Sequence, residues 1–357
     1  MKRLIALLCA ALVMSGCAAQ TNQPGGQTGE CSTLKVFNVG EYIGQDVIAK
    51  FEKQFKVKVV YDLFASNEEM YTKLLSGESY DIIVPSDYMI ERMILENRLQ
   101  KLDWSKIPNR ENLIAGLQNQ QYDPQDEYSA PYFWGTVGII YDSTKVDQAE
   151  VERQGWNIFR DTKYSGRIYF YDSERDAFMM ALKSLGYSMN TNDPAQIDEA
   201  YNWLRAMSDT MAPVYVTDEV IDYMISGVKD MAYVYSGDAT YMISENPDLK
   251  FWTPEEGTNL WTDAMVVPAN AKCPALAYEW INFMLSDEIS EENTLYVGYA
   301  SSNQAVFDQV STDEEEGYGG IDAYIPRLGY EKDEVFHYDE AQRKKVSELW
   351  TLIKAEH

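Results

Sequence analysis

The stretch Leu260-Trp261-Thr262-Asp263-Ala264-Met265-Val266-Val267-Pro268 opens with an aromatic residue and an acid, then runs apolar to a proline. As a β-strand it places Trp261 and Asp263 on one face, because side chains alternate with a period of two. A carboxylate at the end of an apolar strand is costly unless a cation meets it, and the indole offers that cation an electron-rich wall. The alternative interpretation is a solvated aspartate beside a core tryptophan. The same pairing recurs at other strand ends, which favours a cation site.

Strand and helix patterns alternate on both sides of this stretch. Buried strands are predicted at Leu34–Val39, Val57–Tyr61 and Tyr80–Pro85, with helices between them. The alternation resumes at Tyr132–Tyr141, Arg167–Tyr171 and Met231–Tyr235. This order predicts an α/β fold whose mostly parallel sheet is wrapped by helices. Because such sheets bind ligands at the carboxyl ends of their strands, the residues that follow each strand are the candidates for a site.

The N-terminus predicts export. Lys2 and Arg3 precede an apolar run from Leu4 to Val13, which is too short to span a bilayer, so residues 1–16 are interpreted as a cleaved signal peptide. Met14-Ser15-Gly16-Cys17 resembles a bacterial lipobox. By that resemblance Cys17 becomes the lipidated first residue and 17–32 a flexible tether, which places the protein on the outer face of the membrane or in the periplasm. The alternative is a soluble secreted protein.

Composition excludes several function classes. The chain has 357 residues and a formal net charge of −27, so its surface repels nucleic acid and attracts cations, although such charge also serves solubility alone. Only two histidines are present, and no metal-ligand spacing occurs, which argues against a metal centre, a cofactor of that kind or a Ser-His-Asp hydrolase. A disulfide between Cys31 and Cys273 is conceivable, but the position of Cys31 in the tether argues against it.

Several segments, taken in order, resemble the spermidine/putrescine-binding lipoproteins of polyamine ABC importers. The resemblance runs from about Leu34 to about Ala355, and the segments that carry it are Asn38-Val39-Gly40-Glu41-Tyr42, Ser66-Asn67-Glu68-Glu69-Met70-Tyr71, Tyr80-Asp81 with Val84-Pro85-Ser86, Pro131-Tyr132-Phe133-Trp134-Gly135, Leu185-Gly186-Tyr187-Ser188, Trp261-Thr262-Asp263, Pro268-Ala269-Asn270-Ala271 and Gly298-Tyr299. Each segment alone is weak, and their shared order is the signal.

The resemblance implies a two-lobed periplasmic-binding-protein fold of type II with the ligand in the cleft between the lobes. Lobe 1 would comprise 33–139 and 263–309, and lobe 2 would comprise 140–262 and 310–357. It also implies a binding protein without enzymatic activity, a monomer that delivers a polyamine to a membrane permease. Matched position by position, the ligand-binding residues would be Glu41, Tyr42, Ser86, Tyr88, Asp176, Tyr235, Trp261, Asp263 and Tyr299.

The chemistry of these residue types fits a polyamine, since carboxylates suit ammonium groups and aromatic walls suit methylenes. Three departures from the family pattern are Val39 in place of an aromatic residue, Tyr235 in place of tryptophan, and Ser173 in place of an acid. They weaken the case for a triamine and leave room for a diamine or another cation.

Simpler interpretations remain for single residues. Glu41 could be a first-turn acid near a helix dipole, Asp176 could complete a helix cap, and the tyrosines could be ordinary half-buried residues. We expect Asp87 and Asp238 to be solvated or capping residues and His337 to be a surface histidine. Two other functions stay open: the same scaffold binding another organic cation, such as a cationic amino acid, and a secreted carbohydrate-active hydrolase, since a tryptophan and two carboxylates also suit glycoside hydrolysis.

Overall fold

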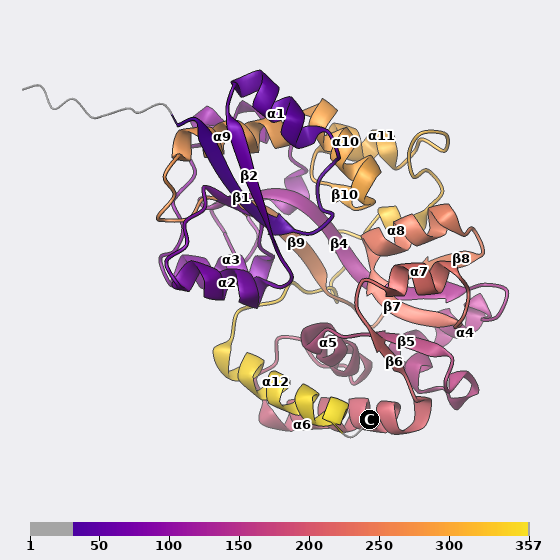
Figure 1. Cartoon of the computed structure of the whole chain (residues 1–357). Coiled ribbons are helices and arrows are strands. Elements are labelled where there is room, and N and C mark those ends of the chain that lie inside the picture. The colour runs from indigo at the N-terminus through magenta and orange to yellow at the C-terminus, as the bar shows by residue number, and fades with distance from the viewer. Residues whose placement is uncertain (1–30, 356–357) are drawn as a thin grey trace, which may run out of the picture. The chain divides into compact units, whose positions relative to one another are not determined.

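One long strand, β4 (Ser129–Asp142), organises the sheet, and every residue in it is buried. In this computed structural model, which describes residues 31–355, the sheet order is β2-β1-β3-β9-β4-β7-β5-β6. Residues 129–136 of β4 pair with β9 (Leu260–Val266), whereas residues 137–142 pair with β7 (Met231–Tyr235) and β8 (Leu249–Trp252). The strand therefore belongs to two half-sheets, as Figure 1 shows.

The first half-sheet holds the N-terminal strands. β1 (Thr33–Val39) lies parallel to both β2 (Lys58–Phe64) and β3 (Ile82–Ile83), and β3 pairs antiparallel with β9. The connecting helices are α1 (Val47–Phe55), α2 (Asn67–Leu75) and α3 (Asp87–Leu95). Later in the chain, α9 (Pro274–Met284), α10 (Asp287–Val297), β10 (Ala300–Ser301) and α11 (Gln304–Val310) follow, and β10 pairs with β4.

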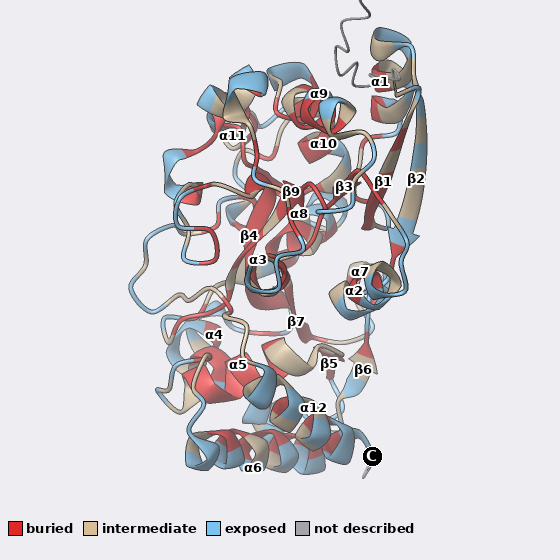
Figure 2. Cartoon of the chain, turned by 90° about the vertical axis from the view of Figure 1, so that its left-hand side faces the viewer, coloured by how far each residue is buried: buried red, intermediate tan, exposed pale blue. Residues whose placement is uncertain are grey.

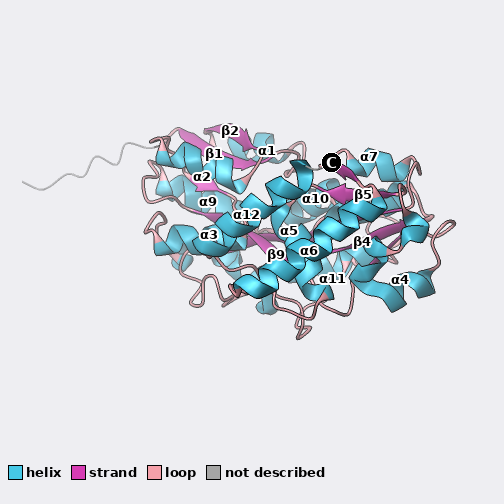
Figure 3. Cartoon of the chain, turned by 90° about the horizontal axis from the view of Figure 1, so that it is seen from below, coloured by secondary structure: helices cyan, strands magenta, loops and turns pink. Residues whose placement is uncertain are grey.

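The second half-sheet also contains three neighbouring parallel strands. β5 (Ile168–Tyr171) lies between β6 (Val214–Val216) and β7, parallel to both. The helices of this part are α4 (Gln148–Gln154), α5 (Glu174–Ser184), α6 (Pro194–Met211), α7 (Val220–Ile225), α8 (Ser236–Glu245) and α12 (Glu340–Ala355). Figure 3 shows helices flanking the strands, and in Figure 2 the strands β4 and β9 are among the most completely buried segments.

The predicted α/β class is confirmed, and the local signals explain most boundaries. The Ser66 hydroxyl accepts from the Glu69 backbone N–H at the start of α2, as the predicted capping box requires. The predicted strand Tyr80–Pro85 shrinks to Ile82–Ile83, although most of that run is buried. The residues of this run are apolar because they are buried between β1 and β9, although only two of them pair as a strand.

A disulfide joins Cys31 to Cys273, with a Cα–Cα distance of 5.8 Å. The sequence analysis argued against this disulfide because it placed Cys31 in a flexible tether. That argument was wrong, because Cys31 lies just before β1. The bond fastens the start of β1 to the turn before α9, beside the Asp81 carboxylate, which accepts from the backbone N–H groups of Lys272 and Cys273. The signal peptide, Cys17 and most of the tether lie outside the described residues. Within residues 31–355, no helix combines the length and apolarity that a membrane span requires.

Candidate functional site

The candidate site lies where strands of the two half-sheets end. Tyr42 follows β1, Asp176 follows β5, and Tyr235 ends β7, while Trp261 and Asp263 lie on β9. β5 and β7 are parallel neighbours, which places Asp176 and Tyr235 at one edge of the sheet. The antiparallel strand β9 brings Asp263 to Tyr42 and Trp261 to Tyr235. The loop after α10 adds Tyr299 from the first half-sheet.

Three carboxylates in the site each accept a hydrogen bond from a tyrosine hydroxyl. Tyr42 donates to Asp263 at 2.7 Å, and Tyr235 donates to Asp176 at 2.8 Å. Tyr299 donates to Asp238 at 2.7 Å. Among residues 31–355, no lysine or arginine forms an ion pair with these three acids. Neutral donors alone satisfy the acids, so their charge is uncompensated at contact distance.

The rings of the site form a continuous aromatic row, which comprises Tyr42, Tyr299, Trp261 and Tyr235. Neighbouring ring centroids are 5.6, 5.2 and 6.0 Å apart, and each pair meets edge to face. Glycines make room for this row: a Cβ on Gly237 would lie 2.2 Å from the Tyr299 ring, and one on Gly135 would lie 2.5 Å from Trp261. The indole N–H of Trp261 is buried without a hydrogen-bond partner. The row is an apolar wall beside the three acids.

Burial without a counter-ion disfavours the charged carboxylates. Desolvation raises the pKa of Asp263, opposed by hydrogen bonds from Ser86 and Tyr42 and by the charge of Arg175. Desolvation also raises the pKa of Asp238 to about 7, against the hydrogen bond from Tyr299. A cation at contact distance would favour the ionised form of both groups. The geometry and electrostatics together suit a small organic cation with apolar segments.

Comparisons with known proteins now identify the family. Residues 46–317 match the model of the bacterial extracellular solute-binding proteins. The chain belongs to this family. It is 33% identical over 306 residues to the spermidine/putrescine-binding periplasmic protein of Escherichia coli, covering 85% of this chain and 84% of the relative. It is 30% identical over 366 residues to a putrescine/cadaverine-binding protein of Pseudomonas aeruginosa, covering 98% of each.

A solved structure supports the same family and fold. The spermidine/putrescine ABC transporter substrate-binding protein PotD of Streptococcus pneumoniae, solved with calcium and HEPES, matches with a TM-score of 0.78 at 35% identity. The match covers 91% of this chain and 99% of that one. The predicted family and the two-lobed solute-binding fold are therefore confirmed, while the bounds of the lobes stay a prediction.

Six of the nine predicted ligand-binding residues come together in this solute-binding protein: Tyr42, Asp176, Tyr235, Trp261, Asp263 and Tyr299. Ser86, the residue directly before α3, lies beside them, because it forms an isolated β-bridge with Asp263. Glu41 is exposed, with a left-handed φ of 53°. Its place in the site stays a prediction.

Tyr88, the last of the nine, is engaged by the protein itself. The Arg175 guanidinium carbon lies 3.5 Å from the centre of the Tyr88 ring, and the Tyr88 hydroxyl donates to Glu68. These two residues border a cavity of about 30 Å³ that is also lined by Phe178 and Phe336. One face of the ring is therefore covered by an internal cation. Nη1 of Arg175 is buried without a hydrogen-bond partner.

Two acids differ from the expectation of solvated or capping residues. Asp87 is 1% exposed and accepts from the backbone N–H groups of Thr262 and Tyr88, so it is buried and fixes β9 against α3. Asp238 stands in the first turn of α8 as expected, but it also bonds Tyr299 across the two half-sheets. The pairing of an acid with an aromatic residue after a strand, applied to Tyr235 and Asp238, would have found it.

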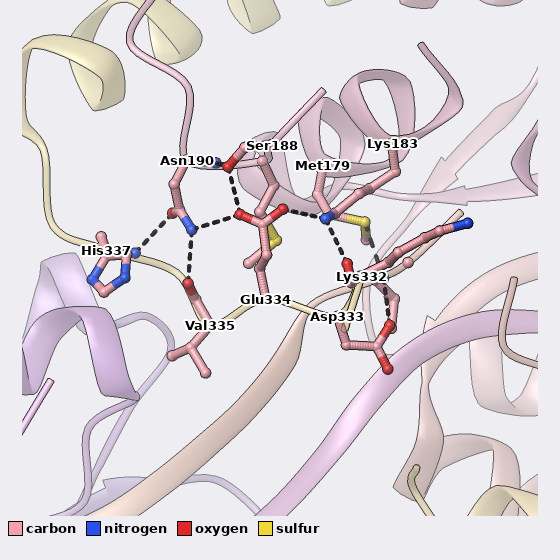
Figure 4. Close-up of polar contacts among 12 residues, drawn as sticks. Met179, Lys183, Ser188, Asn190, Lys332, Asp333, Glu334, Val335 and His337 are labelled. Carbon is pink, nitrogen blue, oxygen red and sulfur yellow. Dashed lines mark hydrogen bonds and ion pairs between the residues drawn. The ribbon is translucent and has the colours of Figure 1, made fainter. Parts of the chain in front are cut away.

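His337 is half-buried and joins two parts of the chain. Its backbone N–H donates to the Asn190 side chain, as Figure 4 shows, while its ring nitrogens lie 3.3 Å from Glu91 and 2.7 Å from Gln121. The prediction of a plain surface histidine missed these contacts.

Within residues 31–355, no group of three or more histidines, cysteines or acids could hold a metal ion.

Proposed function

We propose that this solute-binding protein captures a polyamine, putrescine or spermidine, between its lobes and delivers it to the permease of an ABC importer. One observation carries the proposal: three acids whose only direct partners are neutral donors lie along an aromatic row. We further propose a monomer with lobe bounds as predicted, anchored to the outer face of the membrane by lipid on Cys17.

The geometry suits the two parts of such a ligand. A polyamine alternates ammonium groups with methylene segments, so it needs carboxylates at intervals and apolar walls between them. An ion pair at about 4 Å gains roughly 1 kcal/mol in bulk water but about 4 at an effective dielectric of 20. Closure of the two lobes over the ligand would exclude water, lower the effective dielectric and strengthen each ion pair.

The test is calorimetric titration of ligand-stripped protein with putrescine, spermidine and butylamine. We expect saturable binding of at least one polyamine and binding of butylamine weaker by about a hundredfold, because butylamine lacks the second ammonium group. Butylamine removes one charge while it keeps the four-carbon chain, so it separates charge recognition from apolar contact. Absence of heat with both polyamines, or equal affinity for butylamine, would contradict the proposal.

A second candidate ligand is a cationic amino acid. The observation in its favour is the buried, unpartnered Nη1 of Arg175, since a guanidinium is the group that a ligand carboxylate would need. Against it, the guanidinium already stacks on Tyr88. Titration with lysine under the same conditions decides between the two: binding of lysine tighter than that of putrescine would favour the amino acid.

A further inference from the structure

The aromatic row does not end at Tyr235. The ring of Tyr171, a residue not among the predicted site residues, meets the Tyr235 ring edge to face at a centroid distance of 5.4 Å. Tyr171 is the last residue of β5 and is half-buried. The row therefore continues for one more ring, from the interior of the site toward the solvent.

The added ring has a carboxylate of its own. The Tyr171 hydroxyl donates to Oδ1 of Asp218 at 2.9 Å, which repeats the tyrosine-to-aspartate bond of the three inner pairs. Asp218 follows β6, whose Val216 is the parallel register partner of Tyr171. Because β6, β5 and β7 are parallel, Asp218, Asp176 and Asp238 all follow the carboxyl ends of adjacent strands.

The outer pair is more exposed than the inner pairs. Asp218 is exposed, and within the described part of the chain it forms no ion pair with a lysine or arginine. Its charge nevertheless reaches the inner site: desolvation is the largest cause of the raised pKa of Asp238, the bond from Tyr299 opposes it, and the charge of Asp218 adds to it. A cation held at Asp218 would thus be continuous with the inner acids.

We propose that Tyr171 and Asp218 form an outer cation subsite that holds the terminal ammonium group of a polyamine longer than a diamine. The proposal rests on the proposed function and deepens it. The inner acids would hold the two ammonium groups shared by all polyamines, with the aromatic row along the chain between them. Asp218 supplies a carboxylate at a third strand end of the same edge, after β6.

A structural role for the pair is the competing explanation. The Tyr171–Asp218 bond could serve only to fix the turn that leads into α7, without any ligand contact. The two roles make different predictions, because a structural role gives no reason for the length of the ligand to matter.

The experiment compares Asp218→Asn with Asp222→Asn and the unchanged chain, each stripped of ligand and titrated with spermidine and putrescine. Asp222 is the matched control, since it is an exposed acid four residues away, on α7. We expect Asp218→Asn to weaken spermidine binding about fivefold and to change putrescine binding less than twofold, as for a partly exposed charge pair. Asp222→Asn should change neither.

The ratio of the two affinities within one variant is the deciding number, because misfolding lowers both together. An unchanged ratio in Asp218→Asn, whether both ligands weaken or neither does, would overturn the outer subsite. An equal shift of the ratio in Asp222→Asn would overturn it as well, since distant charge alone would then explain the effect. Absence of binding of both polyamines to the unchanged chain would instead refute the proposed function.

Discussion

Two acid-rich regions of this molecule differ in where their positive partner comes from. At the segment after residue 330, the Glu334 carboxylate meets the ammonium group of Lys183 and accepts from Ser188 and Asn190, all within the chain (Figure 4). At the candidate site, Asp176, Asp238 and Asp263 meet only hydroxyl and amide donors.

The electrostatic outcome follows this difference. Burial raises the pKa of Glu334, but the bonds from Lys183 and Ser188 outweigh it and leave the pKa below its usual value. The pKa values of Asp238 and Asp263 are raised instead. Where the chain supplies the cation, its removal leaves a buried charge without a partner and destabilises the fold. Where the chain supplies none, a cation that binds from outside completes the pair. The contrast predicts which variants lose binding and which lose stability.

The largest expected effect is on binding, from Asp263→Asn. Loss of a buried charge partner costs about 3 kcal/mol, or roughly a hundredfold in Kd for a polyamine. The free protein should be no less stable, because its pKa already shows that burial disfavours the charged form of Asp263. Titration calorimetry measures the first effect and urea unfolding the second.

Asp172→Asn is the matched control for this variant. The Asp172 carboxylate lies at the end of a strand, directly after β5, but it accepts from Lys354 and Trp350, so the chain itself supplies its cation. Its loss should leave the Kd within about twofold, in line with a surface ion pair. Equal losses in the two variants would refute the distinction between completed and uncompleted acids.

The next effect is on stability. Lys183→Met leaves the half-buried Glu334 without its cation and should lower the free energy of unfolding by about 2 kcal/mol in urea. Polyamine affinity should stay within about threefold. The double variant Lys183→Met with Glu334→Gln should recover most of the loss, since no unpaired charge remains. Full loss of binding in the single variant, with no loss of stability, would reverse the assignment of the two regions.

The sequence predicted the first-order features of both the fold and the site. Alternating strands and helices predicted the α/β class, and the strand ends supplied six residues that do meet. The features that the sequence analysis missed are contacts between segments far apart in the chain. Asp238 stands in the first turn of α8, where an acid is common, and its bond to Tyr299 leaves no local pattern. The disulfide joins cysteines 242 residues apart, and Arg175 covers Tyr88 from a different half-sheet.

A smaller effect concerns pH. Asp238 has a pKa of about 7, and a bound ammonium group requires its charged form. Polyamine affinity should therefore rise about tenfold from pH 6 to pH 8, with proton release near pH 7. For the free protein the sign is opposite: because the folded pKa lies above the unfolded one, the stability contributed by Asp238 is lost as pH rises from about 4 through 7.

Asp238→Asn isolates this pH effect. The variant should bind more weakly at pH 8 but with little dependence on pH between 6 and 8. Calorimetry in two buffers of different ionisation enthalpy measures the released protons directly. The same pH slope in the variant as in the unchanged chain would assign the titration to another group.

The smallest effect separates hydroxyl from ring in the aromatic row. Tyr42→Phe keeps the wall but removes the hydrogen bond to Asp263, which helps to hold that carboxylate in its charged form. The loss of one such bond costs about 1 kcal/mol, so polyamine binding should weaken about fivefold. The control is Tyr318→Phe, because Tyr318 is also buried and its hydroxyl donates to the backbone carbonyl of Leu295 instead of to an acid of the site. If Tyr42→Phe bound polyamine more tightly, the hydroxyl would compete with the ligand for the carboxylate and would not support it, and the neutral donors of the candidate site would be groups that the ligand displaces.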